Sequence, residues 1–484
     1  MAVYKHGVYT SEQATSMSAP ITGTAALQVV VGTAPVNLLA HPEEAVNKPF
    51  LVNTYQEAVQ SVGYNEDFEA YTLCEAISAS FQVIGVAPLV LINVLDPKKH
   101  TSDLAEMTVQ VNKGVAKLEA QGVLAGELVI KSGETALSKD TDYTTSFNDD
   151  GTVNLLMIAG GAGESTTTLT VSGKKLDASK VTAADIVGGV DASTGTETGL
   201  EVIRQIFPKL SMTAGIITAP KFSADPAVSA ALQAKTTEIN GVFRAVCYID
   251  VSDQADGATK YADVKAQKEA QGLTSANGYG VWLHGKIGDK LYNGSTLASA
   301  LTAYTDASND DTPNVSPSNK TLPITETCLA DGTEVLLDQE QANVVNSFGV
   351  ATFLNMQGFR LWGNNTLAYP ATTDPKDRWI SVRRFLNWAA NTFILTYFQK
   401  VDSPANPRLI EAIVDSENIR GNGFVSRGVC ASYEISYNAS ENTTADLLNG
   451  VIRFHQYITP YPPAEAIEDM IEFDPEALSK ALGG

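Results

Sequence analysis

Cysteine is scarce in this sequence of 484 residues, which contains only four. Cys74, Cys247, Cys328 and Cys430 lie singly and far from one another, so no pair has the spacing of a zinc knuckle or of a disulfide framework. Isolated cysteines behave as small apolar side chains that favour buried positions. We therefore predict four reduced thiols in the protein core.

Positive charge is scarce as well. The chain has 33 Lys and Arg residues against 55 Asp and Glu residues, which gives a formal net charge of −22 at pH 7. A phosphate backbone would be repelled by such a chain unless its basic residues gathered on one face. Nucleic acid is therefore not expected among the partners of this protein.

Long hydrophobic runs are missing. The most apolar run, from Phe81 to Leu95, is interrupted by Gly85, Pro88 and Asn93 and is shorter than the ~20 residues that a membrane-spanning helix needs. The first thirteen residues also lack the apolar region of a secretory signal. We expect synthesis in the cytoplasm and no insertion into a membrane.

Motifs for catalysis and cofactor binding are missing too. The glycine-rich segment from Gly160 to Ser165 has Glu164 where a P-loop would place its phosphate-binding lysine, so we interpret it as a hairpin turn. The chain contains no Gly-x-Ser-x-Gly and no His-Glu-x-x-His sequence, and its five histidines are far apart. No enzyme activity, cofactor or metal ion is expected.

One pattern nevertheless leaves a ligand site open. Two apolar runs that we expect to be parallel strands end in Asp96 and Asp250, and open α/β sheets bind ligands at the carboxyl ends of their strands. Aspartate is also common there simply as a turn or helix-capping residue. An α/β ligand-binding protein or enzyme that uses the strand ends near Asp96 and Asp250 is therefore the alternative function.

The sequence does contain an alternation of apolar strands and amphipathic helices on both sides of a polar middle. This alternation predicts a discontinuous, doubly wound α/β domain with a mostly parallel sheet. The middle, residues 121–198, contains thirteen Thr and eleven Gly and is split into short alternating runs, which predicts an inserted β-sandwich. A surface-layer or adhesin protein would also fit an acidic, Thr-rich sandwich, but it should carry an export signal.

After a polar stretch from Asp306 to Lys320, the last third predicts an α+β domain. It combines an amphipathic helix from Ser381 to Gln399 with two alternating strands, from Ala431 to Tyr437 and from Val451 to Thr459. The predicted division of the chain is an N-terminal arm (1–25), the α/β domain in two halves (26–120 and 199–330), the inserted β-sandwich (121–198), a C-terminal core domain (331–460) and a C-terminal arm (461–484).

Several segments in a fixed order resemble a known family. Residues 358–366 (GFRLWGNNT) followed by residues 379–384 (WISVRR) are similar to the core signature of contractile phage tail sheath proteins. Residues 316–320 (SPSNK) and 6–9 (HGVY) resemble segments found upstream in the same family, and residues 450–460 and 466–474 match its last strands in order and spacing.

The resemblance implies a structural subunit and not an enzyme. Such subunits form a helical sheath of stacked hexameric rings around an inner tube, and the sheath contracts to drive the tube through a target cell envelope. The implied partners are further copies of the chain, the inner tail tube protein, and the baseplate and tail terminator proteins. The implied location is a virion tail or a related contractile particle.

The resemblance also implies that both chain ends act as arms, each adding a strand to the core sheet of a neighbour. Alternating side chains at both ends suit that role, because an added strand satisfies backbone groups at an exposed sheet edge. Ordinary strands within one chain are the alternative. The candidate arm residues are Val3, Lys5, Tyr9, Ile467, Ile471 and Phe473.

A locally basic region lies within the acidic chain. Residues 357–428 contain nine Lys and Arg residues against six Asp and Glu residues. Because the family's core domain faces inward, we predict that Arg383, Arg384 and Asn387 contact an acidic tube surface. Salt bridges within the domain are the competing explanation for these charges.

Overall fold

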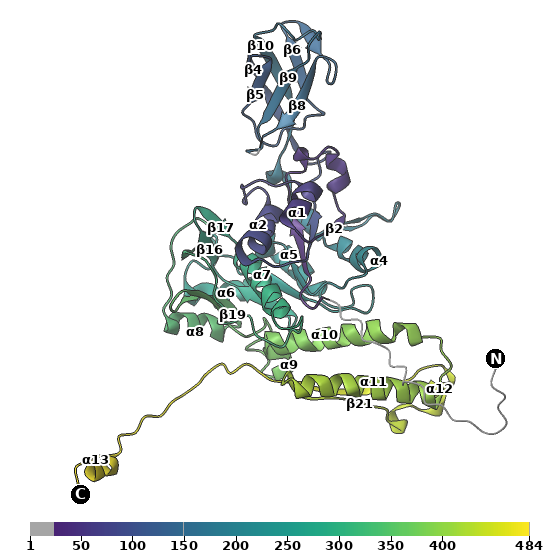
Figure 1. The fold of residues 1–484 in the computed structure, drawn as a ribbon, viewed down its shortest axis with the longest axis vertical. Coiled ribbons are helices and arrows are strands. Elements are labelled where there is room, and N and C mark those ends of the chain that lie inside the picture. Colours follow the sequence, from purple (N-terminus) through teal and green to yellow (C-terminus); the bar gives the residue numbers. More distant parts are fainter. Residues whose placement is uncertain (1–23, 149, 484) are drawn as a thin grey trace, which may run out of the picture.

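The computed structural model describes residues 24–148 and 150–483. Figure 1 shows three parts along the long axis of the molecule: a β-structure at one end, an α/β body in the middle and a pair of long helices at the other end. A C-terminal segment leaves the helical end and runs away from the body. Each part has its own set of paired strands.

The α/β body is built on an eight-stranded sheet in the order β2-β3-β1-β13-β14-β15-β19-β20. The six inner strands run parallel to their neighbours, and the edge strands β2 and β20 are antiparallel. The strands are β1 (Gln28–Gly32), β2 (Pro49–Val52), β3 (Leu89–Asn93), β13 (Ile216–Thr218), β14 (Val246–Asp250), β15 (Gly278–Val281), β19 (Val350–Asn355) and β20 (Phe359–Trp362). A mixed α/β fold with a mostly parallel sheet was expected, and this sheet has that pairing.

The inner strands are nearly continuous runs of apolar residues because both faces of the sheet are covered. All five residues of β1, β3 and β14 are buried. Helices of the body pack against this sheet, and the resulting core joins residues from Ala26 to Ile380. These helices are α1 (Tyr55–Val62), α2 (Thr72–Ile77), α3 (Ala183–Val187), α4 (Ile206–Leu210), α5 (Pro226–Ala234), α6 (Val264–Ala270), α7 (Gly294–Ala307) and α8 (Gln339–Ser347).

Smaller sheets complete the middle of the molecule. A three-stranded sheet has the order β17-β16-β18, and β11 pairs with β12. Their strands are β11 (Gly189–Val190), β12 (Glu197–Thr198), β16 (His284–Ile287), β17 (Lys290–Tyr292) and β18 (Glu326–Cys328). Strand β16 follows β15 almost directly, so it places its residues beside the carboxyl end of the large sheet.

The inserted β-structure contains seven strands in the order β7-β6-β10-β4-β5-β9-β8. They are β4 (Thr101–Asn112), β5 (Val115–Leu118), β6 (Val129–Ser132), β7 (Thr135–Leu137), β8 (Tyr143–Phe147), β9 (Val153–Met157) and β10 (Thr168–Leu176). They enclose a separate apolar core that includes Leu118, Ile130 and Leu155. The expected boundary at residue 121 falls inside this unit, because β4 is polar in sequence and buries little besides Leu104.

The segment Gly160 to Ser165 forms a turn between β9 and β10, as expected, but it is not a hairpin. Strand β9 pairs with β5 and β8, whereas β10 pairs with β4 and β6. The Glu164 carboxylate accepts a hydrogen bond from the Gly160 N–H at 2.9 Å, so the acid that replaces a P-loop lysine closes the turn.

Strands β19 and β20 extend the large sheet, although residue 331 was predicted to begin a separate domain. Strand β19 pairs in parallel with β15, and β20 completes the edge. The sequence shows an apolar strand at residues 350–355 but carries no signal for its pairing partner. The part that stands apart from the large sheet therefore begins near residue 375, not near residue 331.

That C-terminal part packs two long antiparallel helices on a two-stranded sheet (Figure 1). Its elements are α9 (Pro375–Arg378), α10 (Ile380–Tyr397), α11 (Pro407–Ser426), β21 (Cys430–Ser436), α12 (Thr444–Leu448), β22 (His455–Pro460) and α13 (Pro475–Ala481). Phe385, Trp388, Phe424 and Tyr433 form its apolar core. A side chain at Gly421 would place a Cβ 2.2 Å from the Tyr433 carbonyl oxygen, so glycine allows α11 to lie close to β21.

Buried hydrogen bonds hold this two-stranded sheet to the helices. The Glu417 carboxylate of α11 accepts hydrogen bonds from Tyr433 Oη at 2.8 Å, Tyr397 Oη at 3.0 Å and Gln456 Nε2 at 2.9 Å. These partners come from β21, α10 and β22, so one carboxylate ties four elements together.

The remaining sequence expectations can be compared directly. All four cysteines are free and buried, as predicted. Helix α2 is followed by a π-helical turn at Ser78–Ile84, and α4 is preceded by a 3-10 turn at Gly199–Gln205. No helix in the described part of the chain is long and apolar enough to cross a membrane.

Candidate functional site

Three segments that carry the sequence resemblance lie together at one edge of the large sheet. These signature segments are 316–320, 358–366 and 379–384. The middle one contains β20, the edge strand, and the first one runs beside it, with the Asn319 N–H 2.6 Å from the Leu361 carbonyl oxygen. The polar stretch from Asp306 to Lys320 is therefore partly built into the fold.

Side-chain and backbone hydrogen bonds join all three signature segments. Ser316 Oγ donates to Asn364 Oδ1 at 2.6 Å, and the Gly363 N–H donates to Ser318 Oγ at 3.0 Å. The Asn364 carbonyl oxygen accepts from the Ile380 N–H at 2.9 Å. The Ser and Asn residues of the resemblance thus have a common structural role, which is to hold these loops in one arrangement.

Gly363 is needed where the middle segment passes the neighbouring strand. Its φ angle is +146°, and a Cβ at this position would lie 2.8 Å from the Cα of Ala351. A larger residue would push β20 away from β19. This close approach explains why glycine stands between Trp362 and Asn364.

A groove of about 560 Å³ opens beside the signature segments. The beginning of the C-terminal arm, residues 463–466, forms part of its wall. The rest is formed by the signature segments 316–320 and 358–366, by α8, and by Tyr369 and Arg378; it includes Ser316, Asn319, Asn343 and Trp362. The arm therefore leaves the body along a surface that the signature segments build.

Arg378 connects that surface to the arm. Its Nη2 donates to Glu465 Oε2 at 2.7 Å, and its Nε donates to Asn365 Oδ1 at 2.9 Å. Its guanidinium group also lies over the rings of Tyr369 and Trp379, 4.6 Å and 3.9 Å from their centroids. Sequence reasoning missed Arg378 and Glu465, although Arg378 directly precedes the quoted segment that starts at Trp379.

The residues predicted to contact an inner tube are mostly turned into the protein. Arg384 is 3% exposed, and it pairs with the fully buried Asp306 at the end of α7, with Nη1 3.1 Å from Asp306 Oδ1. Burial disfavours the charged form of Arg384, but the adjacent Asp306 carboxylate outweighs this effect and raises the arginine pKa. This pair joins α10 to the α/β body.

The other two predicted contact residues are also engaged within the chain. Asn387 is 4% exposed, and its amide donates to Asn277 Oδ1 at 2.9 Å. Arg383 is more accessible and donates to Asp377 Oδ1 at 3.1 Å. The contact of these three residues with an inner tube stays a prediction, and of the three only Arg383 is not buried. Periodicity along a helix could not show that two faces of α10 are covered, and salt bridges within the chain are what the structure contains.

The C-terminal arm residues have the opposite environment. Ile467, Ile471 and Phe473 are 89%, 89% and 78% exposed, and the segment between β22 and α13 forms neither helix nor strand. Ordinary pairing within the chain, the alternative for this end, is absent in the described part of the arm. The N-terminal arm residues Val3, Lys5 and Tyr9 lie outside the described residues.

The two-stranded sheet has room for further strands. In the described part of the chain, β21 pairs only with β22, and β22 pairs only with β21. Strand β22 therefore keeps an edge without a partner strand, whereas at the outer edge of β21 the Ile435 N–H and carbonyl oxygen bond to the Asn418 side chain of α11. Unpaired edges of this kind accept added strands from other molecules.

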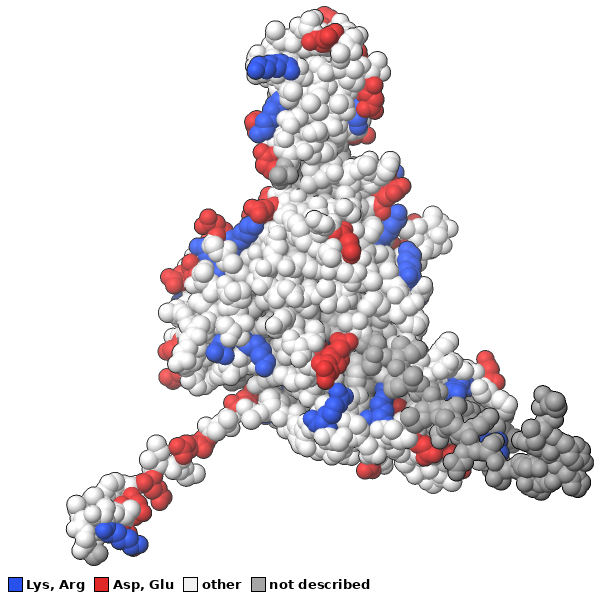
Figure 2. Space-filling model, in the orientation of Figure 1, with Lys and Arg blue, Asp and Glu red and all other residues white. Residues whose placement is uncertain are grey.

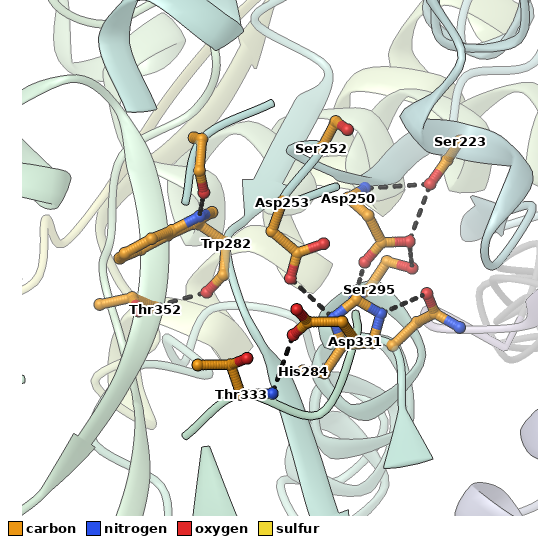
Figure 3. Close-up of polar contacts among 12 residues, drawn as sticks. Ser223, Asp250, Ser252, Asp253, Trp282, His284, Ser295, Asp331, Thr333 and Thr352 are labelled. Atoms are coloured by element: carbon orange, nitrogen blue, oxygen red, sulfur yellow. Dashed lines mark hydrogen bonds and ion pairs between the residues drawn. The ribbon is translucent and has the colours of Figure 1, made fainter. Parts of the chain in front are cut away.

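The strand-end alternative can be tested at Asp250, which lies at the carboxyl end of β14 (Figure 3). Asp250 Oδ1 accepts from the Ser295 N–H at 2.7 Å, and Oδ2 accepts from Ser295 Oγ at 2.7 Å and Ser223 Oγ at 2.9 Å. The residue is 6% exposed, and burial raises the pKa of its carboxyl group. The amino end of α7, where an α/β protein could bind an anion, is thus occupied by the chain's own carboxylate.

A second set of hydrogen bonds continues from that helix end to His284 (Figure 3). Glu75 accepts from both the backbone and the side-chain amide of Asn293, at 2.6 Å each, so Asn293 Oδ1 is left facing His284 Nε2 at 3.2 Å. His284 Nδ1 lies 2.8 Å from Asp253 Oδ2. Both ring nitrogens therefore face acceptors, which requires the doubly protonated, positively charged imidazole.

The pKa values follow from this arrangement. Burial alone would lower the pKa of His284, but the hydrogen bond and the charge of Asp253 outweigh it and raise that pKa. Burial raises the pKa of Glu75 to about 7. Perturbed pKa values often mark catalytic sites, but here the polar atoms are directed at one another, and they hold β16, α2 and α7 together.

Asp96, the other predicted strand end, lies in a turn. Asp96 Oδ1 accepts from the Lys98 N–H at 2.8 Å, and the Asp96 carbonyl oxygen accepts from the His100 N–H at 2.7 Å. Among the residues that the structure describes, no group of three or more His, Cys, Asp and Glu side chains is placed to hold a metal ion.

Similarity to known proteins extends over the full chain. No family model matches it. The tail sheath protein of Burkholderia phage BcepMu is 26% identical over 502 residues, which covers 100% of this chain and 99% of that protein. A putative prophage major tail sheath protein of Pseudomonas aeruginosa is 25% identical over 306 residues, covering 62% of this chain and 75% of that protein.

Solved structures agree on the fold. The helical sheath of the anti-feeding prophage in its contracted state matches with a TM-score of 0.59 at 14% identity, covering 97% of this chain and 99% of that one. The sheath complex of the extracellular contractile injection system PVC, also contracted, matches with a TM-score of 0.56 at 13% identity over 99% of both chains. The resemblance to contractile tail sheath proteins that the sequence indicates is confirmed by these matches.

Proposed function

We propose that this chain is a structural subunit of a contractile tail sheath and that it assembles through its own chain ends. The observation that carries the proposal is the C-terminal arm, which leaves the body (Figure 1) and whose large apolar side chains are exposed. Soluble proteins rarely leave such side chains together in water, so they mark a surface that another molecule covers. The full-length similarity to tail sheath proteins supports the identity of that molecule as another copy.

The same arm can add a strand to the free edge of the β21–β22 sheet in another copy of the chain. In an extended strand, Ile467, Ile471 and Phe473 would lie on one face, because side chains alternate with a period of two. That face would extend the apolar side of the β21–β22 sheet of a neighbour. Each added hydrogen bond would contribute about 0.5–1.5 kcal/mol net, and each buried apolar side chain about 1.5–3 kcal/mol.

The geometry of such contacts favours an open helical assembly. An arm that binds a different surface on the next copy makes a heterologous contact, and its repetition gives rings or filaments. We propose stacked hexameric rings around an inner tail tube protein, with baseplate and terminator proteins at the ends of the particle. Contraction would be a rigid-body movement of subunits about their arms, and it would require neither a cofactor nor catalytic residues.

The alternative, a ligand-binding protein or enzyme at the strand ends, has less support. The carboxylate oxygens of Asp250 are engaged by Ser223 and Ser295, and Asp96 closes a turn. A protein that is similar over the full chain, from Burkholderia phage BcepMu, is named a tail sheath protein. Specific binding of a nucleotide, measured by calorimetry, would be needed to favour this alternative again.

Purified full-length chain should form long tubes, which negative-stain microscopy and sedimentation can detect. Deleting residues 461–484, or separately Met1 to Thr15, should abolish the tubes and leave the thermal unfolding midpoint of the chain unchanged. Monodisperse full-length monomer at high concentration would contradict the proposal. Tubes that persist after both deletions would show that assembly does not depend on the arms.

A further inference from the structure

Among the described residues, one ion pair ties the arm to the body. Within the described part of the chain, the contact between Arg378 and Glu465 is the one hydrogen bond that joins residues 461–473 to the rest of the protein. The next described hydrogen bonds along the chain involve Asp474, at the start of α13. Whatever sets the direction of the arm must act near this point.

Arg378 is held in place independently of the arm. Its Nε donates to Asn365 Oδ1, and the amide of Asn365 donates in turn to the Asn346 carbonyl oxygen at 3.2 Å. The orientation of the Asn365 side chain is thereby set, with its oxygen toward Arg378. The planar guanidinium group also lies over two aromatic rings, a geometry that lysine cannot reproduce.

The backbone on both sides of Arg378 is held as well. The Arg378 carbonyl oxygen accepts from the Thr366 N–H at 2.7 Å. Two residues further on, the Ile380 N–H donates to the Asn364 carbonyl oxygen at 2.9 Å. A short β-bridge joins Asn365 to Trp379. The signature segments therefore present one guanidinium N–H toward the groove in a set direction.

The beginning of the arm suits a directed exit. Pro462 and Pro463 restrict the backbone between the last strand and Glu465. Beyond this point the chain is extended, and residues 466–474 can span about 30 Å. A small change in angle at Glu465 would therefore move the apolar residues of the arm by many ångströms relative to a neighbour's sheet edge.

We propose that Arg378 is the positioning residue of the C-terminal arm, and that the groove of the signature segments serves to aim this arm at the adjacent subunit. This inference rests on the proposed function, because it assigns the arm a target in another copy. It also gives the signature segments a role: they orient Arg378 and provide the surface along which residues 463–466 leave the body.

Because the arm is acidic, a single cationic residue, Arg378, can hold it. Figure 2 shows acidic side chains along the arm, and the sequence from Glu465 to Glu476 contains six acidic residues and no basic one. Both partners of the anchor are partly exposed, with side-chain exposures of 23% for Arg378 and 36% for Glu465. A partly exposed pair contributes only about 0–1 kcal/mol to stability, so its loss should alter the arm and not the fold.

The direct test measures arm direction in the full-length chain. Exposed cysteines introduced by Glu340→Cys on α8 and Met470→Cys on the arm can carry spin labels, since the four native cysteines are buried. In dilute, unassembled protein we expect a defined distance distribution between the labels. Arg378→Met, Arg378→Lys and Glu465→Ala should each broaden it at least about twofold, and the exchange Arg378→Glu with Glu465→Arg should not restore it, because a glutamate cannot stack on the two rings.

Assembly supplies a second measurement. Because a loosely held arm has a lower effective concentration at its target, the Arg378 variants should form tubes about tenfold more slowly than the wild-type chain. The matched control is Arg204→Lys, which changes an exposed arginine paired with Glu197 far from the arm. This control should leave both the distance distribution and the assembly rate unchanged.

The outcomes separate this inference from the proposed function. Unchanged label distances in all Arg378 and Glu465 variants would overturn the positioning role, even if tubes form normally. Failure of the wild-type chain to form tubes would contradict the proposed function, while the distances in dilute protein would still decide whether Arg378 directs the arm. Full retention of the wild-type distribution in Arg378→Lys would show that charge alone suffices and would overturn the role of stacking.

Discussion

The buried polar cluster around Asp250 and His284 and the C-terminal arm differ in where their side chains find partners. Around Asp250 and His284, charged groups are buried, and each is hydrogen-bonded to groups of the same chain. Along the arm, apolar groups are exposed and have no partner in the same chain among the described residues. The buried charges are closed to other molecules, whereas the exposed apolar groups are open to them.

This contrast indicates where function lies in the molecule. A buried polar group costs free energy unless it finds partners, and an exposed apolar group costs free energy until it is covered. In an α/β enzyme the strand ends would be the open site. Here the carboxylate at the end of β14 is engaged by the chain's own groups, and the exposed apolar residues lie on the extended C-terminal segment.

The largest effect should come from making the arm polar. With Ile467→Ser, Ile471→Ser and Phe473→Ser combined, tubes should be lost, because at about 1.5–3 kcal/mol per buried side chain the affinity between subunits falls at least about a thousandfold. The thermal unfolding midpoint should not change. Glu468→Gln with Glu472→Gln is the matched control and should still assemble; normal tubes from the triple variant would refute the role of the arm.

A smaller but still large effect is expected inside the body. Arg384→Met should lower the free energy of unfolding by about 3–5 kcal/mol, because it leaves the fully buried Asp306 without its partner. Urea denaturation can measure this loss. Arg383→Met, one residue away, should cost less, because its partner Asp377 is 24% exposed and can be hydrated once the arginine is removed. Equal losses in the two variants would show that the buried pair has no special role in joining α10 to the body.

The smallest effect concerns pH. His284→Leu should lower the free energy of unfolding by about 1.5–3 kcal/mol at pH 6, since hydrogen bonds to charged groups contribute about that much. Because the folded-state pKa of His284 is raised, its stabilising contribution is complete below its ordinary value near 6.5 and is lost as pH rises through the raised value.

Glu75 acts in the same direction. Its pKa of about 7 lies above the ordinary value of 4.5, so its contribution is complete below pH 4.5 and is lost as pH rises toward 7. Wild-type protein should therefore be less stable toward urea at pH 8.5 than at pH 5.5, and His284→Leu should reduce the difference. A wild-type stability that rises over this range would contradict the charged state assigned to His284.

Sequence patterns predicted the secondary structure well where hydrophobic periodicity is strong. Strand β19 is found at the residues expected for it, and α10 was expected to within two residues at each end. The pattern failed for β4, because the side chains of this strand are mostly polar. For β19 it predicted the strand but not that the strand pairs with β15. Domain limits depend on pairing, so the limits near residues 121 and 331 did not coincide with those of the sheets.

At the candidate site, too, sequence patterns predicted some features and not others. Arg384 and Arg383 are neighbours on one helix and look alike in sequence, yet one is enclosed against α7 and the other reaches the surface. Arg378 gave no separate signal, because its importance comes from Glu465, 87 residues away, which only the folded chain brings near.

By itself, the sequence determined the strongly periodic strands and helices, the buried cysteines and the apolar alternation of the last segment, because local periodicity and composition encode which side chains must leave water. Only the tertiary structure decided which of the charged residues are enclosed and which strands share a sheet. It also decided that the three signature segments meet beside the arm. These features depend on contacts between residues distant in the chain, and no local pattern of side chains specifies them.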